Sequence, residues 1–160
     1  MDEDAKTSLL RAIPYGLFAA CTNSPEGDDH VFLLSWVTQA SFDPPLLACG
    51  VHEESTAHDH LAEEGREIAI NLLADDQEEL ARTLLEGPEF GEDEVAGTPY
   101  KEGANGCGLL PETLGAIEAR VVSVTEGGDH DVLLVEIEDV HRFREGEVLT
   151  HESSGMTYAG

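Results

Sequence analysis

Residues 35–42 are the first stretch of this chain whose side chains could bind a ligand. Ser35, Thr38 and Ser41 place three hydroxyl groups where a core strand would carry aliphatic residues. Asp43-Pro44-Pro45 then ends the strand, because proline has no N–H group to donate to a sheet ladder. A hydroxyl-rich strand that runs into a stiff turn suits a polar, planar ligand lying against the backbone. On its residues alone, the segment also fits an edge strand entering a turn.

Ser55 and Thr56 form a second candidate binding element, because they stand at the expected start of a helix. Free backbone N–H groups and the positive end of the helix dipole meet there and suit a phosphate group. The same pair also fits a plain helix N-cap without a ligand. The neighbouring Glu53, Glu54 and His58 include no lysine or arginine. A phosphate would therefore depend on backbone, hydroxyl groups, His58 and distant arginines.

Asn71 and His130 are two further polar residues in informative places. Asn71 interrupts the apolar run 68–73, and a buried amide needs hydrogen-bond partners. Either the neighbouring backbone or a ligand could supply them. His130 follows Gly127-Gly128-Asp129, in which the two glycines favour a sharp turn. Without further information this segment is an ordinary hairpin with an exposed histidine.

Several other chemistries find no support in the sequence. His52, His58 and His60 are close in sequence, but His58 and His60 point to different faces of a helix and no cysteine joins them. We therefore expect solvated histidines and no metal site. The chain has no Gly-x-Ser-x-Gly elbow of a hydrolase, no Gly-x-Gly-x-x-Gly motif and no P-loop. Any nucleotide must be bound by another arrangement.

The charge is the outlier of the composition, with 34 acidic against 8 basic residues and a net charge of -26. Such a surface repels phosphate backbones and anionic lipids, so nucleic acid and membranes are poor candidate partners. An acidic disordered protein is one interpretation, but the acids alternate with apolar runs instead of forming blocks. We favour a folded protein from a halophile, whose screened carboxylates keep its surface hydrated.

The three cysteines and the lack of export signals predict a cytoplasmic protein. The chain has an odd number of cysteines, Cys21, Cys49 and Cys107, and none are spaced as Cys-x-x-Cys. The first two fall in apolar runs, which is typical of inert core thiols. No apolar stretch reaches the length of about 18 residues that a membrane span needs. The N-terminus is acidic and lacks the pattern of a signal peptide.

The apolar periodicity and the turn residues predict a mainly β protein. Strands are expected over 15–22, 31–42, 46–51, 67–73, 115–125, 132–143, 148–151 and 156–158. A helical turn is expected over 8–12, and helices over 56–64 and from Asp75 or Asp76 to Glu86. The turn at 23–29 should return 31–42 as the hairpin partner of the first strand, and the last two strands should form a terminal hairpin. Residues 88–113 should form a long loop.

This order of elements indicates an antiparallel sheet with inserted helices. The strands are mostly joined by hairpin-type turns, so a closed or nearly closed barrel with helices at one end follows. At 160 residues the chain is long enough for one domain with a proper core, and we expect a single domain over 1–160.

The run from Ser35 to Pro45 also resembles a known family. It matches the pattern Ser/Thr-Trp-x-Thr/Ser-Gln-x-Ser-Phe-x-Pro-Pro of the flavin-reductase-like proteins, a group that includes flavin reductases and flavoredoxins. The resemblance extends from Arg11 to Tyr158 and implies an antiparallel split β-barrel that binds FMN. The fold inferred from periodicity agrees with it.

The resemblance also implies roles for individual residues. It places Ser35, Trp36, Val37, Thr38, Gln39, Ser41 and Phe42 along the flavin, Ser55 and Thr56 at its phosphate, and Asn71 nearby. The family carries a Gly-Asp-His run at 128–130, whose histidine lies near the flavin and the nicotinamide. His130 is therefore the candidate catalytic residue, acting through orientation or charge balance, since hydride transfer belongs to the cofactor.

Three functions remain open from the sequence. The first is a reductase that takes hydride from NADH or NADPH and reduces flavin or a small acceptor. The second is an FMN electron carrier reduced by a partner protein. The third is a flavin-free barrel that acts as a binding module, which the missing basic residue near Ser55 supports. The family and the continuous apolar strands 31–34 and 132–135 further predict a two-fold homodimer.

Overall fold

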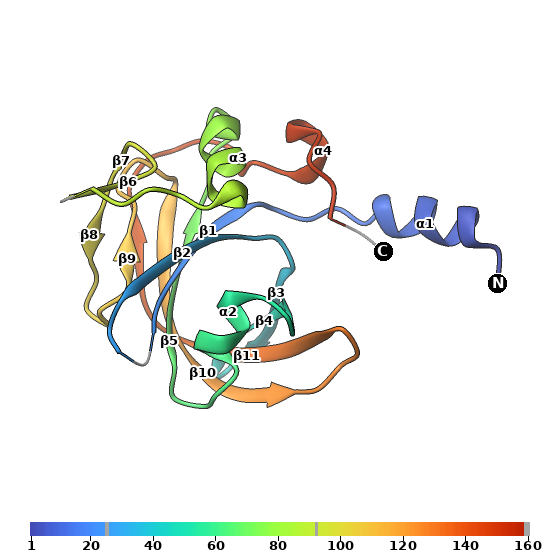
Figure 1. Cartoon of the computed structure of the whole chain (residues 1–160), viewed down its shortest axis with the longest axis horizontal. Helices are drawn as coiled ribbons and strands as arrows, with labels where there is room; N and C mark the ends of the chain where they lie inside the picture. Colours follow the sequence, from blue (N-terminus) through green and yellow to red (C-terminus); the bar gives the residue numbers. More distant parts are fainter. Residues whose placement is uncertain (25, 92, 159–160) are drawn as a thin grey trace.

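The computed structural model describes residues 1–24, 26–91 and 93–158. Pro25, which belongs to the turn expected at 23–29, lies outside them. Figure 1 shows a curved sheet with short helices around it. The seven strands of this sheet are β1 Phe18–Asn23, β2 Asp29–Leu34, β3 Val37–Phe42, β4 Pro45–His52, β5 Glu67–Leu72, β10 Gly115–Thr125 and β11 His130–Arg142. The helices are α1 Glu3–Arg11, α2 Thr56–Leu61, α3 Glu78–Glu86 and α4 His151–Ser154.

The large sheet is antiparallel throughout and has the order β2-β1-β5-β10-β11-β4-β3. Its two edge strands are β2 and β3, yet only Ser35 and Trp36 separate them in the chain. Three peptide steps span at most about 11 Å, so the two edges must approach each other. The sheet therefore curls into a split barrel whose open seam is crossed by Ser35 and Trp36. The predicted fold class is confirmed.

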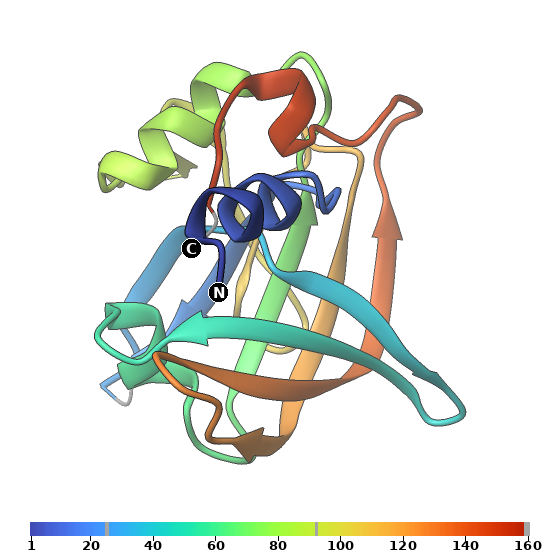
Figure 2. The same cartoon turned by 90° about the vertical axis from the view of Figure 1, so that its right-hand side faces the viewer.

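Two clusters of buried apolar side chains fill the barrel and its cap. One lies around Leu61, Ile68, Ile70 and Leu133, and the other joins Leu73 and Leu110 to the inner face of α3. Helix α3 lies over β1 and β2, and α2 over β1 and β4 (Figure 2). The helices of the described segments have at most nine residues, too few to traverse a bilayer.

The predicted strand 31–42 is wrong, because the chain bends in its middle. Val37 N–H donates to the Ser35 carbonyl at 3.2 Å, which makes a tight turn, and the Trp36 carbonyl accepts from Gly50 N–H at 2.9 Å. Only β2 is the hairpin partner of β1. Strand β3 instead pairs with β4 at the opposite edge, and Figure 2 shows the tip of this hairpin reaching beyond the rest of the sheet.

The predicted terminal hairpin is also wrong. Thr150 and Ser153 form a reciprocal capping box that starts α4, and Gly155 ends it in the left-handed conformation at φ 68°. Val148 and Thr150 form isolated bridges to Ala74 and Gly16 instead.

The other helix boundaries differ more modestly from the prediction. Helix α1 extends over Glu3–Arg11 instead of one turn at 8–12, and α2 ends at Leu61. Gln77, not Asp75 or Asp76, is the N-cap residue of α3, and the Asp76 carboxylate binds the guanidinium of Arg144. In the described part of the expected long loop, four two-residue strands form two small hairpins, β6 Glu94–Val95 with β7 Thr98–Pro99 and β8 Lys101–Glu102 with β9 Gly108–Leu109.

Candidate functional site

Two adjoining cavities lie at the seam of the barrel. The first, which we call the α2 cavity, has a volume of about 570 Å³ and is lined by Ser35, Ser55 and Thr56 among others. The second, the Trp36 cavity, has a volume of about 910 Å³ and is lined by Trp36, Val37 and Thr38. Six residues line both, namely Tyr15, Gly50, His52, His130, Thr157 and Tyr158. The strand entry at 35–38 therefore passes from one cavity to the other.

The Trp36 side chain packs closely against Gly50 of β4. A Cβ atom at Gly50 would lie 2.9 Å from Trp36 Cε3 and 3.3 Å from Trp36 Cβ, closer than side chains tolerate. The missing side chain at position 50 thus lets the Trp36 side chain pack directly against the backbone of β4 at Gly50. The indole remains one-third exposed, which leaves part of its surface available to a ligand.

His130, at the start of β11, is held by partners on both ring nitrogens. Its Nδ1 lies 2.7 Å from Asp129 Oδ1, and its Nε2 lies 2.7 Å from the Tyr158 hydroxyl. An ionised carboxylate only accepts, so Nδ1 carries a proton, and Tyr158 O–H donates to Nε2 when the ring is neutral. The ring centroid lies 4.6 Å from that of Trp36 and 4.8 Å from that of His52. The imidazole is therefore fixed in orientation at the junction of the two cavities.

Two pKa shifts accompany this arrangement. The hydrogen bond from His130 lowers the pKa of the Asp129 carboxyl, so Asp129 keeps its negative charge over the working range of pH. Burial, with a smaller contribution from the charge of Asp129, raises the pKa of the Tyr158 phenol. Tyr158 therefore keeps the proton that it shares with His130 under all but strongly alkaline conditions.

Tyr158 reaches His130 because Tyr15 anchors the C-terminal segment. Tyr158 N–H donates to the Tyr15 hydroxyl at 2.6 Å, and that hydroxyl donates to the Tyr158 carbonyl at 3.2 Å. The Tyr15 ring stacks on His151 of α4 at 4.2 Å between centroids. The segment 156–158 thus forms one wall of the site.

Ser55 and Thr56 both line the α2 cavity, but they differ in whether their hydroxyl groups are free to bind a ligand. Ser55 caps α2, since its Oγ accepts from His58 N–H at 3.2 Å and donates to the His52 carbonyl at 2.7 Å. The Ser55 hydroxyl therefore already has protein partners as both donor and acceptor. Within the described residues the Thr56 hydroxyl makes no hydrogen bond to protein, so Thr56 is the one able to meet a ligand directly.

Four of the residues singled out from the sequence lie away from both cavities. Gln39, Ser41 and Phe42 follow β3 toward the hairpin tip, where Phe42 is 91% exposed. Asn71 is fully buried, and its amide bridges β1 and β9. It donates to the Ala19 and Gly108 carbonyls at 3.1 Å each and accepts from Leu110 N–H at 2.8 Å. Asn71 therefore has backbone partners at both ends of its amide, and we leave it out of the site.

The three neighbouring histidines also separate in the structure. His58 Nε2 lies 2.8 Å from Asp131 Oδ2, and His60 packs edge-on against His30. His52 lies opposite His130 in the β4–β11 register and packs against it, so it belongs to the site and is not simply a solvated histidine.

Sequence reasoning missed His52, Gly50, Tyr15 and Tyr158 as site residues. His52 and Gly50 lie opposite residues 130 and 132 in the β4–β11 register. This position would have identified them as site residues, but it can be used only once the strand pairing is known. The described residues that line the two cavities include no lysine or arginine, and His30, His52 and His130 are their only potential cations.

The comparisons with known proteins agree with this fold and show the family of the chain. Residues 10–160 match the Flavin reductase like domain, so the chain belongs to this family. A flavin reductase from Pseudomonas putida is 25% identical over 153 residues, which cover 96% of this chain and 84% of that protein. The NADH:FAD oxidoreductase SgcE6 from Streptomyces globisporus, solved in complex with NAD and FAD fragments, has a TM-score of 0.78 at 21% identity and covers 94% of this chain and 90% of that chain. The latter likeness shows the shared fold.

Some relatives are much longer than this chain. Diflavin flavoprotein A 1 from Synechocystis is 28% identical over 162 residues, which cover 99% of this chain and 28% of that protein. The chain spans 22–46% of the length of several other curated relatives. The domain is therefore also used as one part of larger flavoproteins.

Proposed function

We propose that the chain is an FMN-binding reductase that uses NADH or NADPH to reduce flavin or a small acceptor. The observation that carries the proposal is the position of His130 at the junction of two cavities, in a chain of the flavin reductase family. Two planar ligands, a flavin and a nicotinamide, would meet there. The fold of the NADH:FAD oxidoreductase, solved with NAD and FAD fragments, supports this assignment.

The residues present fit a flavin in shape and in most of their polar groups. The seam offers the indole face of Trp36 beside a polar strand entry at Ser35 and Thr38. Aromatic faces stack well on planar rings. When bound, flavin would supply the hydride acceptor or donor, which no side chain of this chain can replace.

The protein side chains would bind and orient the reactants. Trp36 and Thr38 would support the ring system, and Thr56 would meet the polar end of the flavin in the α2 cavity. His130, held by Asp129 and Tyr158, would orient the nicotinamide and balance charge near the reacting ring. The tail residue Tyr158 would exclude water from this junction.

The charge of the protein sets the condition for binding. FMN carries a phosphate, whereas the cavities contain no lysine or arginine in the described residues and the chain has a net charge of -26. Screening by salt reduces the repulsion, with a Debye length of about 3 Å at 1 M. We therefore propose that FMN binds better in molar salt than in dilute buffer.

An FMN electron carrier reduced by a partner protein is the second candidate function. The observation in its favour is that the chain matches 28% of the length of the longer Diflavin flavoprotein A 1, so a domain of this kind occurs within a larger flavoprotein. The same flavin site would serve, but the nicotinamide would not need to enter the Trp36 cavity.

We also propose that the chain forms a two-fold homodimer. Helix α1 projects from the body in Figure 1 and buries none of its own residues. Leu9 and Ile13 are 71% and 57% exposed, and Val132 on the neighbouring sheet face is 41% exposed. A second copy of the chain would cover this apolar surface next to the Trp36 cavity.

Visible absorption and steady-state kinetics test the functional proposal. The protein is purified in molar KCl, and its spectrum is recorded as isolated and after addition of FMN. A shifted flavin band with NADH or NADPH turnover supports the reductase. A shifted band without turnover supports the carrier, and the absence of any flavin band or shift refutes both flavin functions.

A further inference from the structure

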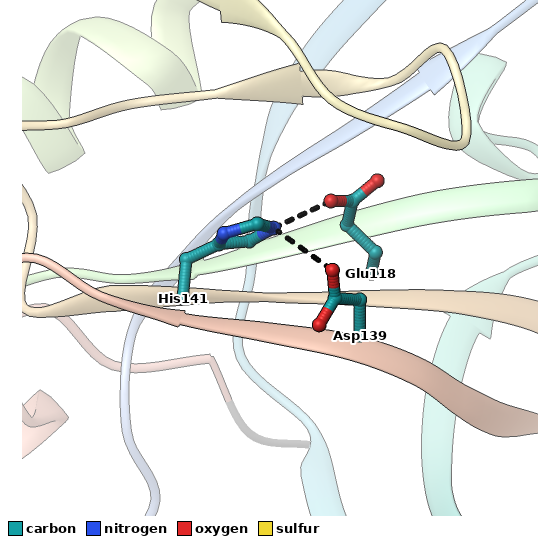
Figure 3. A group of neighbouring side chains, drawn as sticks. All are labelled: Glu118, Asp139 and His141. Atoms are coloured by element: carbon teal, nitrogen blue, oxygen red, sulfur yellow. Dashed lines mark hydrogen bonds and ion pairs between the residues drawn. The ribbon is translucent and has the colours of Figure 1, made fainter.

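A group of three potential metal ligands lies outside the two cavities, on β10 and β11. Glu118 and Asp139 are directly opposite in the strand register, and His141 follows Asp139 by two positions. Opposite residues and residues two apart share one face of a sheet, so the three side chains point the same way. Figure 3 shows the imidazole of His141 directed at both carboxylates.

The ligand atoms are already close to one another. His141 Nε2 lies 2.5 Å from Glu118 Oε1 and 3.9 Å from Asp139 Oδ2, and all three ligand atoms lie within 4.8 Å of each other. One imidazole nitrogen and two carboxylate oxygens form a ligand set suited to Zn²⁺ and related divalent metals. Small side-chain movements would bring the three atoms to the roughly 2.0–2.2 Å bond lengths of such a site.

Each carboxylate is held in place by a backbone group that leaves its second oxygen free for the site. Glu118, which is 1% exposed, accepts from Asn105 N–H through Oε2 at 2.8 Å. Asp139 accepts from Val140 N–H through Oδ1 at 2.8 Å. Such outer hydrogen bonds orient metal ligands and reduce the cost of assembling them. This distinguishes the group from the scattered carboxylates of the acidic surface.

The group also has an open side. The side chains of Asp139 and His141 are 60% and 28% exposed, whereas that of Glu118 is buried. An ion could therefore enter from solvent and keep water as a further ligand. The strand register shifts just beyond Glu118, between Glu118 and Ala119, and such irregularities often redirect side chains at sites.

We propose that Glu118, Asp139 and His141 bind one divalent transition-metal ion of the Zn²⁺ class. The ion would replace the proton between His141 Nε2 and Glu118 Oε1, and that proton would leave to solvent or move to the other ring nitrogen. Two carboxylates and a neutral imidazole balance the charge of a dication. Through Asn105 the site would fasten the segment between β8 and β9 to the sheet, so its role would be structural.

Metal titration of the full chain, stripped with EDTA and kept in molar KCl, tests this proposal. Calorimetry with Zn²⁺ and the visible spectrum with Co²⁺ measure binding, and thermal unfolding measures stabilisation. The proposal predicts one tight equivalent of Zn²⁺ in the wild type and a higher Tm when it is bound. Asp139→Asn and His141→Gln should each weaken binding by about tenfold or more.

Asp131→Asn provides a matched control. His58 and Asp131 form a comparable pair at 2.8 Å outside this group, and neither belongs to the proposed metal ligands. Asp131→Asn should bind Zn²⁺ like the wild type. Equal binding in all four proteins would show non-specific uptake by the acidic surface. Lack of a tight equivalent in the wild type would show that Glu118 and His141 form an ion pair only. Either result overturns the proposal.

Discussion

Gly50→Ala is the most informative single substitution, because it displaces the indole of Trp36 without replacing any polar side chain of the site. The new Cβ would lie 2.9 Å from Trp36 Cε3 and 3.3 Å from Trp36 Cβ. Favourable carbon–carbon contacts lie at about 3.5–4.0 Å, so the indole must move by roughly 0.5 Å or more. Because the Trp36 carbonyl also accepts from Gly50 N–H, the chain crossing at the seam must shift with it.

The structure sets the size of two effects. Overpacking of this kind costs about 1–3 kcal/mol of stability, which for a domain of this size corresponds to a Tm lower by about 2–12 °C. Aromatic packing contributes about 0.5–1.5 kcal/mol, so loss of the stacked indole should weaken FMN binding by about 2- to 13-fold. The movement of the indole relative to His130 and Tyr158 should also change its fluorescence.

The assay uses Trp36 itself, because it is the only tryptophan in the chain. FMN is titrated in molar KCl while indole emission is recorded, and thermal unfolding is measured on the same samples. Gly128→Ala is the matched control, since a Cβ there meets nothing within 4 Å and the position lies in the turn before His130. If Gly50→Ala behaves like Gly128→Ala in emission, Tm and FMN affinity, the indole does not form part of the site.

Three further predictions concern stability and assembly. Asn71→Ala removes the side-chain partner of two carbonyl groups and one N–H group, so it should lower the free energy of unfolding by roughly 3 kcal/mol in urea. The FMN affinity of the folded fraction should stay unchanged. A selective loss of FMN affinity would show that Asn71 belongs to the site. Burial, and to a smaller extent the nearby His60, lower the pKa of the His30 imidazole below 6.5. The contribution of His30 to folding stability is therefore fully present above about pH 6.5, and it is lost as the pH falls below that value. NMR should find the His30 midpoint below 6.5 and higher in His60→Ala, whereas a midpoint above 6.5 contradicts the burial argument. Light scattering in molar KCl should give twice the monomer mass. Lower salt should shift the equilibrium toward the monomer, and so should the double substitution Leu9→Glu with Ile13→Glu. A wild-type monomer in molar salt refutes the dimer.

Much of the fold follows from the sequence because the strands carry local signals. Apolar alternation and turn residues located β1, β4, β5, β10 and β11 to within a few residues. The bend at Ser35 and Trp36 has no such signal, because it depends on Gly50 N–H from a strand that comes later in the chain. The helix α4 was missed for a related reason. Its capping residues Thr150 and Ser153 are present in the sequence, but four residues give too little periodicity to outweigh the β-forming residues around them.

The site was harder to predict than the fold, since its residues meet only through tertiary structure. Ser35 to Thr38 and His130 were identified from the family resemblance and lie at the cavities. Tyr158 was not, because its contact with His130 depends on the path of the chain after α4 and on the anchor at Tyr15. Asn71 shows the opposite case. A polar residue in an apolar strand indicates a hydrogen-bond demand, and here the backbone of neighbouring strands meets it.

We propose that flavin and nicotinamide meet beside His130. Anaerobic mixing of the FMN-loaded protein with NADH or NADPH in molar KCl, followed through the visible flavin band, tests it most directly. We expect complete bleaching by at least one of the two nucleotides, much faster than for free FMN under the same conditions, and slower bleaching in Gly50→Ala than in Gly128→Ala. Bleaching of the FMN-loaded wild type no faster than that of free FMN, with both nucleotides, would contradict it.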